Sequence, residues 1–174
     1  KPRKADVAFT DNADDIFNDP EINFIVELID DADAAYTIVK RALQSGMPVV
    51  SGNKKIETLC KEFNKKFPCL QLCIFYSYAR EQVKKGESIT PIDRSKTLAS
   101  VRRADSGGSI SISGNKKIKS LEKEFDTVFG LYAQVCYYTP EGRGVYTSES
   151  ADEMTLASFN EYCVKRGCPQ NKWK

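Results

Sequence analysis

The side chains available for chemistry in this chain are thiols, amines and carboxylates, because its 174 residues include no histidine. Histidine is the usual general base near pH 7, so its absence excludes Ser-His and Cys-His arrangements. The six cysteines stand at positions 60, 69, 73, 136, 163 and 168, and none forms the CxxC pair of common zinc sites. We therefore expect no metal site and no catalytic residues, and we favour a protein that is not an enzyme.

Cys163 is the best candidate for a reactive thiol. Lys165 and Arg166 follow it in the segment EYCVKRGC, and a nearby positive charge lowers the pKa of a thiol. The alternative, which we favour, is a partly buried helix cysteine beside solvated basic residues.

The even number of cysteines permits disulfides, and Cys163–Cys168 is the closest candidate pair. Three other cysteines lie in apolar runs, where a free thiol acts as a small core residue: Cys60, Cys73 and Cys136. No apolar run reaches the roughly 18–20 residues that span a membrane. These patterns favour a reducing compartment, so we expect a cytoplasmic protein.

Two lysine pairs, Lys54–Lys55 and Lys116–Lys117, lie in a hexapeptide, SGNKKI, that occurs at residues 51–56 and again at 113–118. Asn53 and Asn115 are predicted N-caps, which places both lysine pairs in the first turn of a helix. Positive charge there opposes the helix dipole unless an anion is bound. The lysines are therefore candidates for binding a phosphate or an acidic partner, and the alternative is a set of solvated lysines kept by duplication.

An acidic cluster near the N-terminus could suggest a divalent metal: Asp11, Asp14, Asp15 and Asp19. Its spacing lacks the glycine at position 6 and the closing glutamate of the EF-hand loop. We favour a solvated helix start.

Aromatic residues gather in the predicted strands: Phe75, Tyr76, Tyr78, Tyr132, Tyr137, Tyr138 and Tyr146. Residues 1–50 carry five basic and ten acidic residues, net −5, which leaves net +7 for residues 51–174. A basic, aromatic sheet could stack the bases of a single-stranded nucleic acid. Tyrosine is equally typical of ordinary sheets and of protein interfaces.

The first fifty residues alternate strands and helices. A nearly continuous apolar run at 22–29 predicts a strand buried on both faces. A helix is predicted next, with acidic residues at its start, basic residues near its end and Gly46 just beyond. The segment MPVV predicts a second strand, so the whole is a βαβ unit with a parallel pair.

The segment NDPEINFIVELIDDADAAYTIVKRALQSGMPVVSGNKK resembles the second half of the nucleotide-binding domain of homoserine dehydrogenases, over about residues 5–55. The resemblance implies NAD or NADP as cofactor, with Ser51, Gly52, Asn53 and Lys54 beside the nicotinamide. The glycine-rich fingerprint that holds the pyrophosphate is absent from this sequence. Without it, dinucleotide binding should be weak or lost.

Beyond residue 50 the chain aligns with itself. SGNKKIETLCKEFNKKF matches SGNKKIKSLEKEFDTVF, with apolar residues at i, i+3, i+7 and i+11 of one helical face. A strand-like run follows in each copy, LQLCIFY and YAQVCYY. After it we predict a turn, REQVKKGE and TPEGRG, then a short extended piece, SITPI and GVYTS, and a helix that contains TLAS. This part resembles uncharacterised bacterial proteins with two copies of a TLxKEFxxxF…TLAS pattern, which implies no activity.

We therefore predict an α+β fold, a Rossmann-like βαβ fragment followed by two βαββα repeats, with segments 1–50, 51–112 and 113–174. The leading functional hypothesis is a non-catalytic binding protein, an inhibitor or antitoxin-like partner of another bacterial protein. One alternative is a homoserine dehydrogenase-like NAD(P)-binding protein or remnant. The other is a protein that binds single-stranded nucleic acid.

Overall fold

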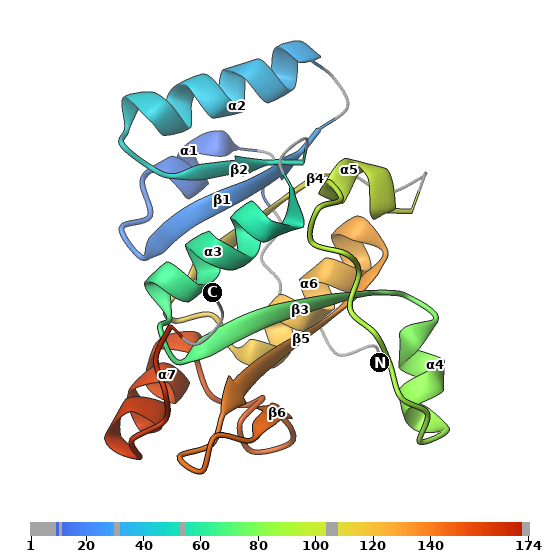
Figure 1. The fold of residues 1–174 in the computed structure, drawn as a ribbon. Coiled ribbons are helices and arrows are strands. Elements are labelled where there is room, and N and C mark those ends of the chain that lie inside the picture. The colour runs from blue at the N-terminus through green and yellow to red at the C-terminus, as the bar shows by residue number, and fades with distance from the viewer. Residues whose placement is uncertain (1–9, 11, 30–31, 53–54, 104–107, 172–174) are drawn as a thin grey trace, which may run out of the picture.

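The computed structural model describes residues 10, 12–29, 32–52, 55–103 and 108–171 and shows an α+β fold with two three-stranded sheets (Figure 1). In the first sheet, β1 (Ile22–Leu28) is the central strand. It pairs in parallel with β2 (Val49–Ser51) and antiparallel with β4 (Gly108–Ser113). The helix α2 (Ala32–Gln44) connects β1 to β2, and it contacts α1 (Ala13–Phe17).

The second sheet is antiparallel, with β5 (Leu131–Tyr138) between β3 (Leu70–Tyr76) and β6 (Gly144–Tyr146). Two helices, α3 (Ile56–Lys66) and α6 (Ile118–Phe129), lie between the two sheets (Figure 1). The remaining helices flank these layers: α4 (Ala79–Lys84), α5 (Leu98–Val101) and α7 (Leu156–Lys165).

One hydrophobic core joins both sheets to the helices between them. The predicted helical faces are buried, with Leu59 and Phe63 of α3 and Leu121 and Phe125 of α6 each 0% exposed. Alternate residues of β1, β3, β4 and β5 point into the same core, as the period of two in a strand requires. The three segments distinguished in the sequence therefore share one core.

The two stretches that contain the hexapeptide make matching backbone hydrogen bonds to the stretches that contain TLAS. The amide of Ala99 donates to the carbonyl of Gly52 (3.0 Å), and the amide of Ala157 donates to that of Gly114 (2.9 Å). Thr97 and Thr155 each cap the helix that follows, accepting a hydrogen bond from the amide three residues on. The repeated residues thus hold α3 to α5 and α6 to α7, which is a structural role.

Steric crowding explains why glycine is the second residue of both copies of the hexapeptide. A Cβ at Gly52 would lie 1.6 Å from Cδ1 of the buried Leu28, and one at Gly114 would lie 3.1 Å from Cβ of Ala157. The close approach of neighbouring chain segments therefore favours glycine at both positions.

Three local predictions are corrected. The helices begin at Ile56 and Ile118, so Lys55 and Lys117 occupy the N-cap positions and Asn115 does not cap α6. The segment REQVKKGE, predicted as a turn, forms most of α4, because its residues are good helix formers. The segment SITPI contains no strand and contacts β3 through one hydrogen bond, from the amide of Ile92 to the carbonyl of Ile74 (2.8 Å).

Candidate binding face on the second sheet

The residues predicted to lie beside a nicotinamide are at the carboxyl end of β2. Ser51 is half-buried and pairs in register with the buried Glu27 of β1. Gly52 is buried, and its amide donates to the Glu27 carbonyl (2.5 Å). Asn53 and Lys54 lie outside the described residues. This end of the sheet has the parallel strand pair that nucleotide-binding folds use, while the phosphate-binding turn is missing from the sequence.

Two of the lysines predicted to bind anions are already paired. The Lys116 ammonium lies 2.5 Å from a Glu124 carboxylate oxygen and also donates to the Ser111 carbonyl (2.5 Å). Lys117 lies 3.3 Å from the Glu153 carboxylate. Lys55 is exposed at the N-cap of α3. Anion binding therefore stays a prediction for Lys55, whereas the buried ion pair of Lys116 opposes it there.

The acidic cluster at the N-terminus stabilises local structure. Asp14 forms an ion pair with Arg41 of α2, and Asp15 accepts a hydrogen bond from the Thr10 hydroxyl (2.5 Å). Asp19 caps the turn before β1 by accepting from the amide of Glu21 (2.8 Å). Asp11 lies outside the described residues. Among those described, histidine, cysteine and carboxylate side chains nowhere form a group of three or more that could hold a metal ion.

Cys163 of α7 is buried, next to Cys168, which follows the helix. Burial, with a smaller contribution from Cys168, raises the pKa of the Cys163 thiol to about 12. A thiol with this pKa is protonated at neutral pH and is a poor nucleophile. The geometry therefore favours the structural interpretation of this cysteine.

The predicted aromatic set is divided between the two faces of the second sheet. Tyr76 and Tyr137 pack against the main core, and Tyr137 meets the ring of Phe159 edge-on at 5.2 Å between centroids. Tyr132 and Tyr146 both contact Phe75 on the opposite face, because strand residues alternate between faces. A single platform on which bases stack would need all these rings on one face of the sheet. Their division between two faces therefore weakens the nucleic-acid hypothesis.

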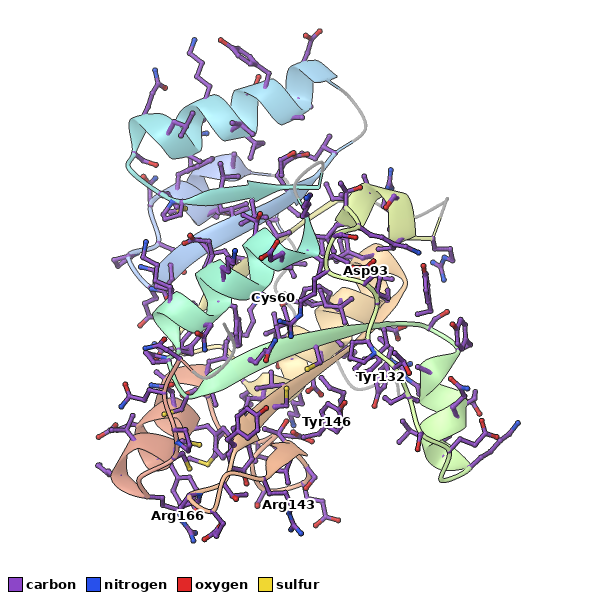
Figure 2. All side chains as sticks on the ribbon, in the orientation of Figure 1. Cys60, Asp93, Tyr132, Arg143, Tyr146 and Arg166 are labelled. Atoms are coloured by element: carbon purple, nitrogen blue, oxygen red, sulfur yellow. The ribbon has the colours of Figure 1, made fainter. Side chains whose placement is uncertain are left out.

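The outer face of the second sheet brings aromatic rings and two thiols close together. We call it the aromatic face and define it by Cys73, Phe75, Tyr132, Cys136 and Tyr146. The centroid of the Phe75 ring lies 5.8 Å from that of Tyr132 and 6.1 Å from that of Tyr146. Tyr132 and Tyr146 lie below β3 and β5, on the side away from α3 (Figure 2). Phe75 is fully buried, whereas Tyr146 is 44% exposed.

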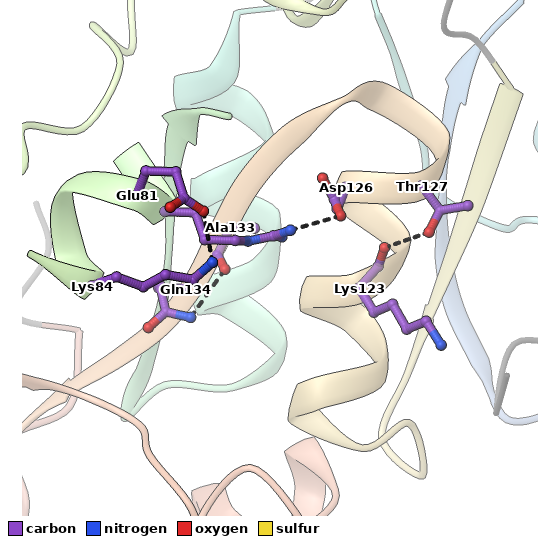
Figure 3. A network of polar contacts seen from close by, with 8 residues as sticks. Glu81, Lys84, Lys123, Asp126, Thr127, Ala133 and Gln134 are labelled. Carbon is purple, nitrogen blue, oxygen red and sulfur yellow. Dashed lines mark hydrogen bonds and ion pairs between the residues drawn. The ribbon is translucent and has the colours of Figure 1, made fainter. Parts of the chain in front are cut away.

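Arg80 of α4 connects the aromatic face to the helix layer. Its guanidinium carbon lies 5.3 Å from the centre of the Tyr132 ring, and one guanidinium nitrogen lies 3.0 Å from the Asp126 carboxylate in α6. Figure 3 shows this region, with Glu81 and Lys84 of α4 paired beside it. Tyr78, at the start of α4, is 63% exposed. The sequence reasoning found these aromatic residues but missed Arg80, which stood in a segment predicted to be a turn.

A separate hollow of about 510 Å³ borders the first sheet, between β4, α1 and α6. Its polar lining includes Asp19, Ser109, Ser111, Lys116, Ser120 and Glu124. Burial raises the pKa of Glu124, although the Lys116 ammonium opposes that shift. Because Lys116 and Glu124 of this hollow are paired with each other, the aromatic face is the better candidate for a binding site.

Comparison with protein-family models, curated proteins and solved structures finds no match for this chain. Within the described ranges, each helix is too short or too polar to cross a membrane.

Proposed function

We propose that this chain is a non-catalytic binding protein that contacts another protein through the aromatic face, as an inhibitor or antitoxin-like partner would. The observation that carries the proposal is the exposure of Tyr146 on a packed aromatic cluster beside Arg80. Tyrosine and arginine are enriched at protein interfaces. A tyrosine ring buries a large area there at small entropic cost. Arg80 is held in place by Asp126, so part of this surface is ordered before binding.

We propose further that the fold combines a Rossmann-like βαβ fragment with two copies of a βαββα repeat, of which the first copy lacks the strand predicted at SITPI. The parallel pairing of β1 and β2 across α2 supports the first part. The matching hydrogen bonds of Gly52 and Gly114 support the second. In this interpretation β1 lies between the first strands of the two repeats and completes their sheet. The N-terminal segment would then act as scaffold for the repeats.

The test is a comparison of partner capture by two matched variants. Tyr146→Ser removes the exposed ring of the aromatic face, and Tyr36→Ser removes an exposed tyrosine ring from α2. Each variant is immobilised and challenged with an extract of the source cells, and retained proteins are quantified by mass spectrometry. We expect the first variant to lose a specific partner by about tenfold or more, and the second to retain it.

Equal retention by both variants would contradict the proposed face. Circular dichroism spectra and melting temperatures of all three proteins provide the control for folding. Since the substituted side chains are exposed, these should agree with the unmodified chain.

The NAD(P)-binding alternative rests on the parallel pair β1–β2 and on Ser51 at its carboxyl edge. Its test is scanning fluorimetry with and without millimolar NADP. A shift of several degrees would support a cofactor site, since ligands that bind the native state raise its melting temperature. Binding to single-stranded nucleic acid predicts an affinity that falls steeply with salt, and absence of binding at low salt would exclude it.

A further inference from the structure

We propose that Cys73 and Cys136 form a redox-active dithiol that small-molecule disulfides oxidise to an intramolecular disulfide. Their sulfur atoms lie 2.8 Å apart, closer than unbonded sulfurs normally approach. The inference is independent of the proposed binding partner, because it concerns the chemistry of the two side chains alone.

The strand register brings the two thiols together. Cys73 of β3 lies opposite Gln134 of β5, and Cys136 lies opposite Gln71, so the two cysteines are diagonal neighbours on one face. The sulfur–sulfur distance in a disulfide is about 2.05 Å, so bond formation needs the sulfurs to approach by only about 0.8 Å. Strand pairing has therefore already placed both side chains for the bond.

The surroundings distinguish the two sulfurs. The hydrogen bond with Cys136 lowers the pKa of Cys73, and the positive charge of Arg94 acts in the same direction. That same hydrogen bond, together with burial, raises the pKa of Cys136. Because thiolates are the attacking species in disulfide exchange, Cys73 is the first nucleophile.

The reaction balances with one molecule of a disulfide RSSR as oxidant. The Cys73 thiolate attacks one sulfur of RSSR, which breaks the S–S bond, releases RS⁻ and leaves a Cys73–S–S–R mixed disulfide. Cys136 then loses its proton and attacks the Cys73 sulfur, releasing the second RS⁻. The two protons of the dithiol end on the two RSH products, so the protein is oxidised by two electrons and RSSR is reduced by two.

The other cysteines provide the contrast. Burial raises the pKa of Cys60 to about 12 and that of Cys163 to about 12, and both are in the main core. Cys73 and Cys136 belong instead to the smaller cluster of the aromatic face. Local opening of this face would admit a small disulfide without unfolding the main core.

The experiment uses the full chain in the native state, incubated with glutathione disulfide at defined ratios to reduced glutathione. Remaining thiols are alkylated, and the peptides are mapped by mass spectrometry. We expect loss of two hydrogens from the chain, a single linked peptide pair containing Cys73 and Cys136, and a melting temperature higher by roughly 5–15 °C, because the bond closes a long loop. Cys163→Ser, the matched control, should behave like the unmodified chain, whereas Cys73→Ser should not form the bond.

Three results would overturn the inference: linkage through Cys163 and Cys168, a stable glutathione adduct on Cys73, or no oxidation while the chain stays folded. Since the peptide map is made on the unmodified chain, the test does not depend on whether the variants fold.

Discussion

The buried ion pair between Lys116 and Glu124 gives the most quantitative prediction. The two side chains are 13% and 8% exposed, and their charged atoms are 2.5 Å apart. Lys116→Met would leave the Glu124 carboxylate buried without its counter-charge. Breaking a buried pair in this way typically costs 3–5 kcal/mol, and we expect about 3 kcal/mol because the neighbouring hollow lets water reach the carboxylate. The melting temperature should fall by roughly 6–12 °C.

The assay is a double-mutant cycle measured by urea unfolding and circular dichroism. Replacing both partners by apolar residues, Lys116→Met with Glu124→Leu, should bring the stability back to within about 1 kcal/mol of the unmodified chain. Lys61→Met serves as control, because its partner Glu57 is on the surface and the pair should contribute nothing measurable.

The pH dependence tests the same prediction independently. Burial raises the pKa of Glu124, and removal of Lys116 should raise this pKa further. A carboxyl with a raised pKa in the folded state favours folding at low pH, and this contribution is lost as the pH rises through the folded pKa. The deficit of Lys116→Met should therefore shrink on acidification. A coupling energy below about 0.5 kcal/mol, or a deficit that does not change with pH, would contradict a stabilising Lys116–Glu124 ion pair. Lys116 would then again be a candidate for anion binding.

Two further predictions concern buried groups. Burial raises the pKa of Glu122 to about 8, although the hydrogen bond from the Val135 amide opposes this shift. The contribution of Glu122 to stability should therefore be greatest at acidic pH and fall between about pH 4.5 and 8. Glu122→Gln should remove most of this fall in urea unfolding at pH 5, 7 and 8.5, and an unchanged slope would contradict the assignment. Gly52→Ala should destabilise the chain by about 2 kcal/mol, because the new methyl group overlaps the buried Leu28. Gly114→Ala, whose nearest neighbour lies 3.1 Å away, should cost less, and equal melting temperatures for the two variants would refute the steric argument.

Local patterns predicted most of the secondary structure. The apolar spacing of α3 and α6 placed Leu59 and Phe63 correctly in the core, because helical periodicity is written in neighbouring residues. The end of α6 was also predictable, since Gly130 adopts the left-handed conformation that glycine favours at a helix C-terminus. The N-termini were not, because each hexapeptide bonds to a distant TLAS segment and the helix starts only at the last residue of the hexapeptide.

The sequence by itself determined an α+β chain with a duplicated motif, the faces of its long helices and the absence of histidine chemistry. Only the tertiary structure decided which strands pair, and therefore which of the candidate residues lie close together. Sheet pairing placed Cys73 against Cys136 and brought Tyr146 of β6 beside Phe75 of β3. Strand pairing joins residues far apart in the chain, so no local spacing encodes these contacts, whereas helical faces and turns follow from residues a few positions apart.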